Sequence, residues 1–344
     1  MATIDDVAKA SGVSKGTVSS VFSKKRPISK EVSERVLAAA EALNYKPNYW
    51  ARSLANRSTH IIGLNIRGES FKFGQFHLSL LNGVLRVCYE HGYRLLVNTL
   101  SPAYLNQVEN IASDPVDGEI LLDPVEDDAR IADRLRSGLP IVVIGRPPAK
   151  YEAQVSYVDN DNVGMAARVT RYLLELGHTE ILFLNAMAGT TVSDDRGNGY
   201  LAAFKRAGRV SKPELMLNKP PEDTPSHGFG YHAALAKLTA LPAITAIIVD
   251  TDMMALGVYK AAEQLGLRIP EQLSVIAFSD NSVLSAEFHP PLTGVRLYAD
   301  RLGTEALQLL LEQMQAEGKS AKRVLVPAEL VVRGSCASPM FTHK

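Results

Sequence analysis

The residues of this 344-residue chain whose types and spacing suit a specific chemistry lie near its N-terminus. Five small, polar or basic residues stand there within six positions: Lys15, Gly16, Thr17, Ser19 and Ser20. Such residues can approach base edges closely and donate hydrogen bonds to bases and phosphate oxygens, and a lysine can donate to guanine O6 or N7. This chemistry requires an element that presents all five residues on its outer side.

The surrounding sequence predicts two short helices joined by a tight turn. Thr3 and the aspartate three residues later have the spacing of a capping box that opens the first helix, and Gly12 ends this helix. Ser14 caps the second helix, in which Val18 and Val21 face the first helix. This pattern is typical of a helix-turn-helix, whose second helix lies in the DNA major groove. The alternative is a pair of ordinary surface helices in a bundle.

A third helix and a short segment complete this region. Ser29 caps the third helix, whose apolar residues recur at helical spacing and close a small core: Val32, Val36, Ala39, Ala40 and Leu43. In "YKPNYWARSLANRST" (45–59), Pro47 and Asn48 signal the start of a helix of about two turns. A helix this short is unstable alone in water, so we expect it to form only when DNA and a second subunit hold it.

These residues resemble the LacI/GalR family of bacterial transcription regulators, and the resemblance covers almost the whole chain. The N-terminal blocks are "TIDDVAKASGVSKGTVSSV" and "NYKPNYWARSLA". Eight further blocks follow in the order of the family: "VDGEILL" (116–122), "VDNDNVG" (158–164), "LGHTEILFL" (176–184), "RGNGYLAAF" (196–204), "DTDMMALGV" (250–258), "LSVIAFSD" (273–280), "PPLTGVRL" (290–297) and "PAELVVRGS" (327–335). Each block alone is weak, but their common order is specific.

From residue 60 onward, short apolar runs such as "GEILLD" and "AIIVD" alternate with helical patterns, which predicts an α/β fold with parallel sheets. The resemblance implies an all-α helix-turn-helix head (1–46), a hinge helix and linker (47–59), and a two-subdomain body like a periplasmic binding protein (60–344). It further implies that the chain crosses between subdomains near residues 160, 290 and 320. We therefore expect an N-subdomain at about 60–159 and 291–320, and a C-subdomain at about 160–290 and 321–335.

Composition agrees with a soluble regulator. The chain is 46% hydrophobic and has 37 basic and 37 acidic residues, but residues 1–58 contain ten basic residues against five acidic ones. A basic head on an acidic body suits DNA binding by the head. Cys88 and Cys336 are the only cysteines, so neither a disulfide framework nor a metal pattern is expected, and no cofactor is predicted. The sequence has no apolar signal run and no membrane span, which predicts a cytoplasmic protein without membrane contact.

The resemblance implies roles for the head residues. Lys15 and Gly16 occupy the positions of the base-reading pair, and Thr17 and Ser19 would hold phosphates. At Ser20 the family more commonly has an arginine that reads a guanine, so the resemblance does not extend to the usual operator half-site. Leu54 matches the leucine that wedges into the minor groove; the alternative is an ordinary helix contact. The complete predicted DNA-binding set is Thr3, Lys15, Gly16, Thr17, Ser19, Ser20, Ser29, Asn48, Ala51 and Leu54. For the only tryptophan, Trp50, we expect a place near its two-fold mate in the hinge helix; the alternative is that it covers the head.

An effector site is expected in the body, at the carboxyl ends of the parallel strands. The resemblance places there Phe76, His77, Arg146, Asn160, Arg196, Thr251, Asp252 and Ser279. Arg196 stands where the family has a ligand-contacting arginine; the alternative is a structural pair with Asp194 or Asp195. For Phe76 and His77 the alternative is core packing.

Two departures from the family bear on the effector. Ser279 in "AFSD" and Gly145 in "IGR" each replace a residue that is acidic in the family, whereas Arg146 and Arg196 are kept. This change predicts a more positive site and an anionic effector, such as a sugar phosphate or a sugar acid, in place of a neutral sugar.

The expected function is that of a sequence-specific transcriptional repressor of a carbohydrate-utilisation operon. It would bind a palindromic operator as a homodimer and respond allosterically to a small sugar or sugar-derived effector. A dimer is expected because the C-terminal residues lack a heptad tail. The sequence contains no GxGxxG after a strand, P-loop, GxSxG or HExxH motif, so no enzyme is predicted. The alternative is a freestanding sugar-binding protein without DNA readout.

Overall fold

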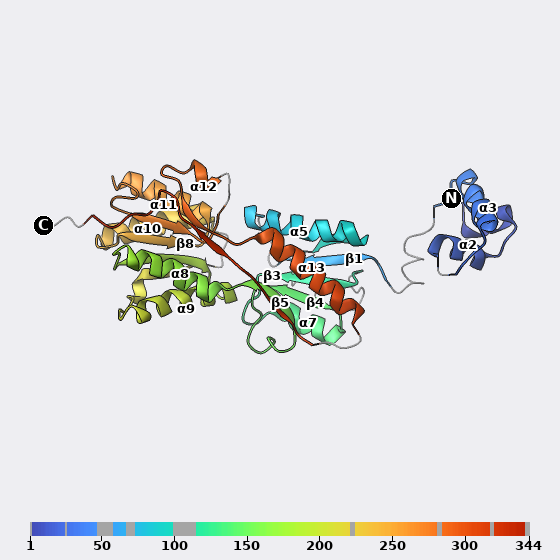
Figure 1. Cartoon of the computed structure of the whole chain (residues 1–344), viewed down its shortest axis with the longest axis horizontal. Coiled ribbons are helices and arrows are strands. Elements are labelled where there is room, and N and C mark those ends of the chain that lie inside the picture. The colour runs from blue at the N-terminus through green and yellow to red at the C-terminus, as the bar shows by residue number, and fades with distance from the viewer. Residues whose placement is uncertain are drawn as a thin grey trace. The chain divides into compact units, whose positions relative to one another are not determined.

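The computed structural model describes most of the chain: residues 2–24, 26–46, 58–66, 73–98, 115–220, 224–280, 284–316 and 320–340. The chain divides into two compact units, Met1–His60 and Ile61–Lys344. The first unit is helical, and the second combines helices with two sheets (Figure 1). None of the described helices is long and apolar enough to cross a membrane.

The head contains α1 (Ile4–Ser11), α2 (Lys15–Ser23) and α3 (Lys30–Ala42). The predicted capping box is confirmed, because Thr3 Oγ1 accepts the N–H of Asp6 at 3.4 Å and Asp6 Oδ2 accepts the N–H of Thr3 at 2.9 Å. Ser14 Oγ accepts from the backbone of Thr17 at 3.1 Å, which confirms the cap of α2. Gly12 ends α1 with a left-handed φ of 64°, a conformation that costs glycine little.

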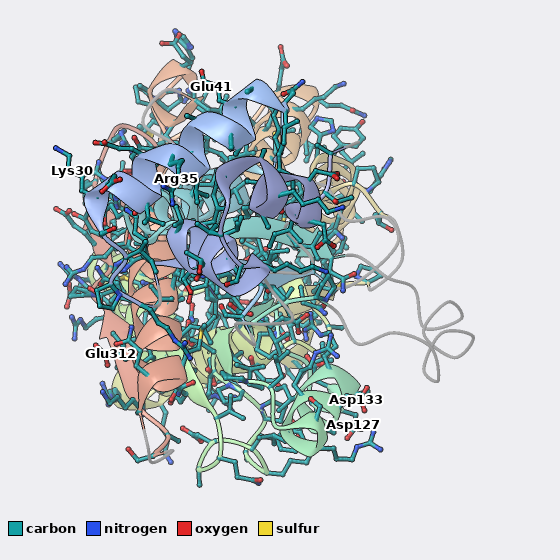
Figure 2. The ribbon with its side chains drawn as sticks, turned by 90° about the vertical axis from the view of Figure 1, so that its right-hand side faces the viewer. Lys30, Arg35, Glu41, Asp127, Asp133 and Glu312 are labelled. Carbon is teal, nitrogen blue, oxygen red and sulfur yellow. The ribbon has the colours of Figure 1, made fainter. Side chains whose placement is uncertain are left out.

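A small apolar core holds these helices together. Val7, Val18 and Val36, one from each helix, are fully buried. The prediction that Leu43 joins this core is wrong: the residue is 38% exposed, because α3 ends at Ala42 and residue 43 leaves its buried face. The opposite side of α3 is charged, and Figure 2 shows this side with three labelled residues: Lys30, Arg35 and Glu41.

The first sheet of the body is parallel throughout and has the strand order β11-β5-β4-β3-β1-β2. Its strands are β1 (Ile61–Asn65), β2 (Arg94–Asn98), β3 (Gly118–Leu122), β4 (Ile141–Ile144), β5 (Ser156–Asn160) and β11 (Arg323–Val326). Helices α5 (Gln75–His91) and α13 (Ala299–Gln315) pack on one face, and α7 (Ala129–Ser137) lies on the other (Figure 1). A Cβ at Gly303 would lie 2.1 Å from the backbone oxygen of Leu80, so glycine permits this close contact of α13 with α5.

The second sheet has the order β12-β10-β9-β8-β6-β7 and is parallel except for the edge strand β12. Its strands are β6 (Ile181–Met187), β7 (Met216–Lys219), β8 (Ala246–Val249), β9 (Ser274–Ala277), β10 (Thr293–Arg296) and β12 (Glu329–Val331). Along β8, Ile247 and Val249 contact the core under α10 (Ser226–Ala240) and α11 (Asp252–Gln264).

The intervening residues of β8, Ala246 and Ile248, contact the core under α8 (Asn162–Glu175) and α9 (Thr191–Arg206). A strand that buries both faces needs a continuous apolar run, which explains "AIIV". A short helix α12 (Leu284–Glu287) and a 3-10 turn η1 (Pro213–Leu215) complete the described elements of this half. The predicted α/β class with parallel sheets is confirmed.

The chain crosses between the two sheets three times, and two of the crossings differ from the prediction. The first crossing follows β5, which ends at Asn160, and leads into α8 (Asn162–Glu175). However, β10 pairs with β9 in the second sheet, and β11 pairs with β5 in the first. The crossings predicted near 290 and 320 therefore follow β10 and β11, and the predicted subdomain segments 291–320 and 321–335 are wrong at these strands. Segment 291–320 begins with β10, which still belongs to the second sheet, and segment 321–335 begins with β11, which still belongs to the first.

Candidate functional site

The N-terminal part of α2 presents the predicted DNA-reading residues to solvent. Lys15, Gly16 and Ser19 are exposed, and Thr17 and Ser20 are half-buried. Val18 between them is fully buried and fixes the rotation of the helix. The head therefore has the geometry by which a recognition helix brings its first turn to base edges.

Lys15 has a partner that the sequence analysis did not identify. Its Nζ lies 2.6 Å from Asp5 Oδ1, and the two side chains are 64% and 44% exposed. An exposed ion pair contributes only about 0–1 kcal/mol, so Lys15 can exchange Asp5 for a base or a phosphate at little cost.

Other predicted DNA contacts divide into two groups. Thr3 and Ser29 cap α1 and α3, so they stand at helix N-termini, where exposed N–H groups can also bind phosphate. Asn48, Ala51 and Leu54 lie outside the described residues, as does Trp50.

A network of arginines and carboxylates joins the carboxyl ends of the two sheets; we call this region the junction. Arg196 on α9 is the most buried of its cations, with a side chain that is 6% exposed. Its Nη1 donates to the Asp250 carboxylate, and its Nε donates to Asn162 Oδ1 at 3.0 Å. The guanidinium carbon lies 4.4 Å from the ring centroid of Phe278. The sequence left open a pair of Arg196 with Asp194 or with Asp195. This alternative is wrong, because the carboxylate that pairs with Arg196 is that of Asp250.

The second arginine connects the two sheets directly. Arg146 follows β4, and its Nε and Nη2 each donate to the Asp195 carboxylate of α9 at 2.9 Å. The hydrogen bond to Asp195 raises the pKa of Arg146, although burial opposes this shift. Gly145 before it has a φ of +105°, and a Cβ there would lie 2.9 Å from Pro124 Cδ. The backbone therefore disfavours any side chain, acidic or not, at residue 145.

The junction contains acidic groups that the prediction of a more positive site did not count. Five carboxylates interact with one another or with the two arginines: Asp123, Asp159, Asp194, Asp195 and Asp250. Burial raises the pKa of Asp159 to about 7, although the N–H of Asn160 donates to its Oδ1 at 2.7 Å. Counting only the replaced residues missed these acids, which outnumber the arginines.

The two residues at the start of α5 have different environments. Phe76 packs against the core of the first sheet, so the core alternative holds for this ring. His77 is held at both ring nitrogens: its Nδ1 accepts from Gly74 N–H at 3.3 Å, and its Nε2 lies 3.7 Å from Asp123 Oδ2. This geometry orients the imidazole toward the carboxylates of the junction.

Three further predicted residues lie together where β8 and β9 end. Thr251 caps α11 by accepting from Met254 N–H at 3.2 Å, and Asp252 accepts from Met253 N–H at 2.8 Å. Burial raises the pKa of Asp252, and the hydrogen bonds with Met253 N–H and with Ser279 oppose this shift. The structure thus brings Thr251, Asp252 and Ser279 together.

The side-chain amide of Asn160 connects the segments in which the chain crosses between the sheets. Its Nδ2 donates to Leu297 O at 3.1 Å and to Val326 O at 2.9 Å, so one amide joins all three crossing segments. Both N–H bonds of this amide are used, which leaves only its oxygen to accept from a ligand.

Sequence reasoning missed the partners of the arginines, namely Asn162, Asp195 and Asp250, and also Asp123. Asp123 and Asp250 directly follow the apolar runs of β3 and β8. A polar residue at the carboxyl end of a buried parallel strand is a usable signal for a site. Within the part of the chain that is described, no group of His, Cys, Asp and Glu is placed to hold a metal ion.

Comparisons with known proteins agree with this architecture. A family model described as "Bacterial regulatory proteins, lacI family" matches residues 3–48, and one described as "Periplasmic binding protein-like domain" matches residues 170–336. The HTH-type transcriptional repressor PurR of Mannheimia succiniciproducens is 34% identical over 97% of this chain and 98% of its own length. PurR of Vibrio vulnificus is 33% identical over 97% of this chain and 98% of its own length.

Solved structures give the same result. The transcriptional regulator CelR in complex with cellobiose has a TM-score of 0.74 at 28% identity, covering 97% of this chain and 100% of that chain. The lac repressor dimer bound to operator has a TM-score of 0.81 at 24% identity, covering 98% and 99%. The latter similarity concerns the fold alone.

A helix-turn-helix head followed by two sheets of the periplasmic-binding-protein type defines a DNA-binding regulator with an effector-binding body. The chain belongs to the lacI family of bacterial regulatory proteins, which confirms the resemblance found in the sequence. Since its relatives are transcriptional repressors, it is a repressor of this family, and the freestanding binding protein is excluded.

Proposed function

We propose that this repressor binds a palindromic operator as a homodimer and that a small, uncharged, hydroxyl-rich molecule at the junction controls its affinity for DNA. The observation that carries the proposal is the pairing of both junction arginines with carboxylates, Arg146 with Asp195 and Arg196 with Asp250. A sugar is the ligand of this chemistry that we expect, and carbohydrate-utilisation genes are the expected targets. The cellobiose bound to the similar regulator CelR supports this choice.

The charge of the junction favours a neutral effector over a sugar phosphate or a sugar acid. Carboxylates accept hydrogen bonds from sugar hydroxyls, whereas an anion would be repelled by the excess acidic groups. An anionic ligand that took Nη1 of Arg196 would displace Asp250 and leave this half-buried carboxylate without its arginine.

A second copy of the chain has a suitable surface on the body. Leu78, Leu85 and Tyr89 of α5 are 44%, 44% and 89% exposed, at helical spacings that place them on one side. On α11, Met253 and Leu256 are 44% and 40% exposed. Exposed apolar residues that recur along a helix are typical of a protein interface. This surface supports the homodimer.

Effector control follows from the contacts that connect the two sheets. The Arg146–Asp195 pair and the crossings held by Asn160 fix how the sheets are disposed. An effector that prefers one disposition changes the operator affinity, and operator DNA must change the effector affinity by the same factor. Such couplings are typically ~1–3 kcal/mol. The proposed route to DNA is residues 47–59, and the proposed contacts in the head are Lys15, Gly16, Thr17, Ser19 and Ser20.

Binding of operator DNA, followed by fluorescence anisotropy with neutral sugars and their phosphates, tests this proposal. We expect a neutral sugar to change the operator affinity by about 5- to 150-fold and its phosphate to have no effect. The variant Asp250→Asn should abolish the response but retain DNA binding. The matched control is Asp127→Asn, because Asp127 is 93% exposed and lies outside the junction network. A response to phosphorylated sugars alone would contradict the proposal.

A further inference from the structure

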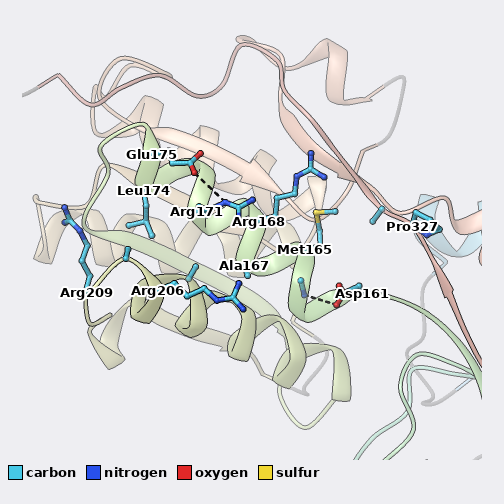
Figure 3. Close-up of a pocket in the computed structure, with 14 residues that line it drawn as sticks. Asp161, Met165, Ala167, Arg168, Arg171, Leu174, Glu175, Arg206, Arg209 and Pro327 are labelled. Atoms are coloured by element: carbon cyan, nitrogen blue, oxygen red, sulfur yellow. Dashed lines mark hydrogen bonds and ion pairs between the residues drawn. The ribbon is translucent and has the colours of Figure 1, made fainter.

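A groove separate from the junction lies along α8 and the end of α9. Its volume is about 750 Å³, and four arginines line it: Arg168, Arg171, Arg206 and Arg209. Figure 3 shows Arg168 and Arg171 projecting from α8 and Arg206 from the neighbouring α9. Apolar residues, among them Met165, Ala167 and Leu174, also line the groove.

Most of the positive charge in this groove has no internal partner. Among the described residues, the side chains of Arg168, Arg206 and Arg209 form neither an ion pair nor a hydrogen bond. Arg171 Nε lies 3.6 Å from Glu175 Oε1, but both side chains are more than half exposed, so this pair is weak. The groove is therefore basic, although the chain beyond residue 58 has more acidic than basic residues.

The acidic groups of the groove do not cancel this charge. Asp161 Oδ1 accepts from Gly164 N–H at 2.9 Å and caps α8, and Glu175 is the remaining acid. Four guanidinium groups against two carboxylates leave a local excess of positive charge. Such an excess raises the free energy of the empty groove and is relieved by an anion.

We propose that this groove is a second ligand site, which takes a small phosphorylated molecule. Guanidinium groups match the oxygens of a phosphate with two parallel hydrogen bonds, and Arg serves this role better than Lys. The volume lies within the range of known ligand sites, and the apolar lining residues suit an organic part of the ligand. A polyphosphate or bisphosphate would engage arginines of both helices at once.

The position of the groove connects it to the rest of the body without overlap with the junction. Arg196 and Asn162 of the same two helices are buried at the junction, whereas Arg168 and Arg206 are exposed in the groove. Pro327, which links β11 to β12, also lines the groove. A ligand held there contacts one of the three crossings, so its binding can bias the disposition of the sheets.

Calorimetric titration of the full chain with inorganic pyrophosphate at constant ionic strength tests the proposal. The test variant is Arg168→Gln/Arg206→Gln. The control is Lys205→Gln/Arg268→Gln, which makes the same change in charge at exposed positions that do not line the groove. We expect saturable binding to the unmodified protein, a loss of at least about tenfold in the test variant, and less than about twofold in the control.

Two results would overturn the proposal. The first is the absence of saturable binding to the unmodified chain. The second is an equal effect of both variants, or no effect of either, because pyrophosphate would then bind elsewhere or respond only to the overall charge. Since the experiment uses neither DNA nor a sugar, it is independent of the function proposed for the junction.

Discussion

Removal of the Asp250 carboxylate isolates a buried guanidinium. In the variant Asp250→Ala, Arg196 keeps only the amide oxygen of Asn162 as an acceptor, at 3.0 Å, and the ring of Phe278. Loss of one partner of a buried ion pair costs about 3–5 kcal/mol. Because the Asp250 side chain is 19% exposed, water can reach part of the site. We therefore expect the free energy of unfolding to fall by about 3 kcal/mol, the lower end of that range.

Removal of the arginine should destabilise the protein less than removal of the carboxylate. Arg196→Met removes the charge but keeps an apolar side chain against Phe278, and it leaves the more exposed partner unpaired. We expect a loss of about 1–2 kcal/mol. The double variant Asp250→Ala/Arg196→Met leaves neither charge unpaired. Its loss in free energy of unfolding should therefore be smaller than the sum of the two single losses by about 2 kcal/mol.

Urea unfolding of the full chain, followed by far-ultraviolet circular dichroism, measures all three variants. The exposed Asp127→Ala serves as the control, with an expected change within about 0.5 kcal/mol. If the losses of the two single variants simply add in the double variant, Arg196 and Asp250 are not coupled, and the description of the junction is refuted.

Three further predictions concern Asp159 of the junction, helix α5 and the recognition helix α2. The pKa of Asp159 is raised to about 7 in the folded chain, from an ordinary value of 3.8. Between these two pKa values the folded protein holds a proton that the unfolded chain has lost, so the free energy of unfolding falls as the pH rises through this window. The variant Asp159→Asn should reduce this fall in the free energy of unfolding, measured by urea unfolding between about pH 5 and about pH 8. Leu85→Lys places a charge among the exposed apolar residues of α5 and should weaken dimerisation at least about tenfold in analytical ultracentrifugation. Lys15→Gln should weaken operator binding by about 1–3 kcal/mol and relax the preference at one base pair, as measured by competition with single-base operator variants.

Local chemistry made the head predictable. The caps at Thr3, Ser14 and Ser29 are hydrogen bonds within four residues, so their spacing in the sequence specifies them. In the body, continuous apolar runs such as "GEILLD" and "AIIVD" predicted β3 and β8, but β5 is among the strands that were not predicted. All five residues of β5 are buried, yet Asp159 and Asn160 are polar because they belong to the hydrogen-bond network at the first crossing.

The site was less predictable because its pairs join distant parts of the chain. The sequence analysis placed Arg146 and Arg196 in the expected region, but their partners lie 49 and 54 residues away. Only the folded chain brings those carboxylates to the arginines. The prediction of a more positive site counted only the replacements at Gly145 and Ser279, which say nothing of the carboxylates such as Asp250.

Selection of DNA fragments from a random pool by the purified full-length protein tests the central claim most directly. The account predicts enrichment of one sequence with two-fold symmetry, whose half-sites are contacted by the exposed first turn of α2 at Lys15 and Gly16. Retention that depends on salt but shows no preferred sequence would contradict it, because such binding needs only phosphate contacts.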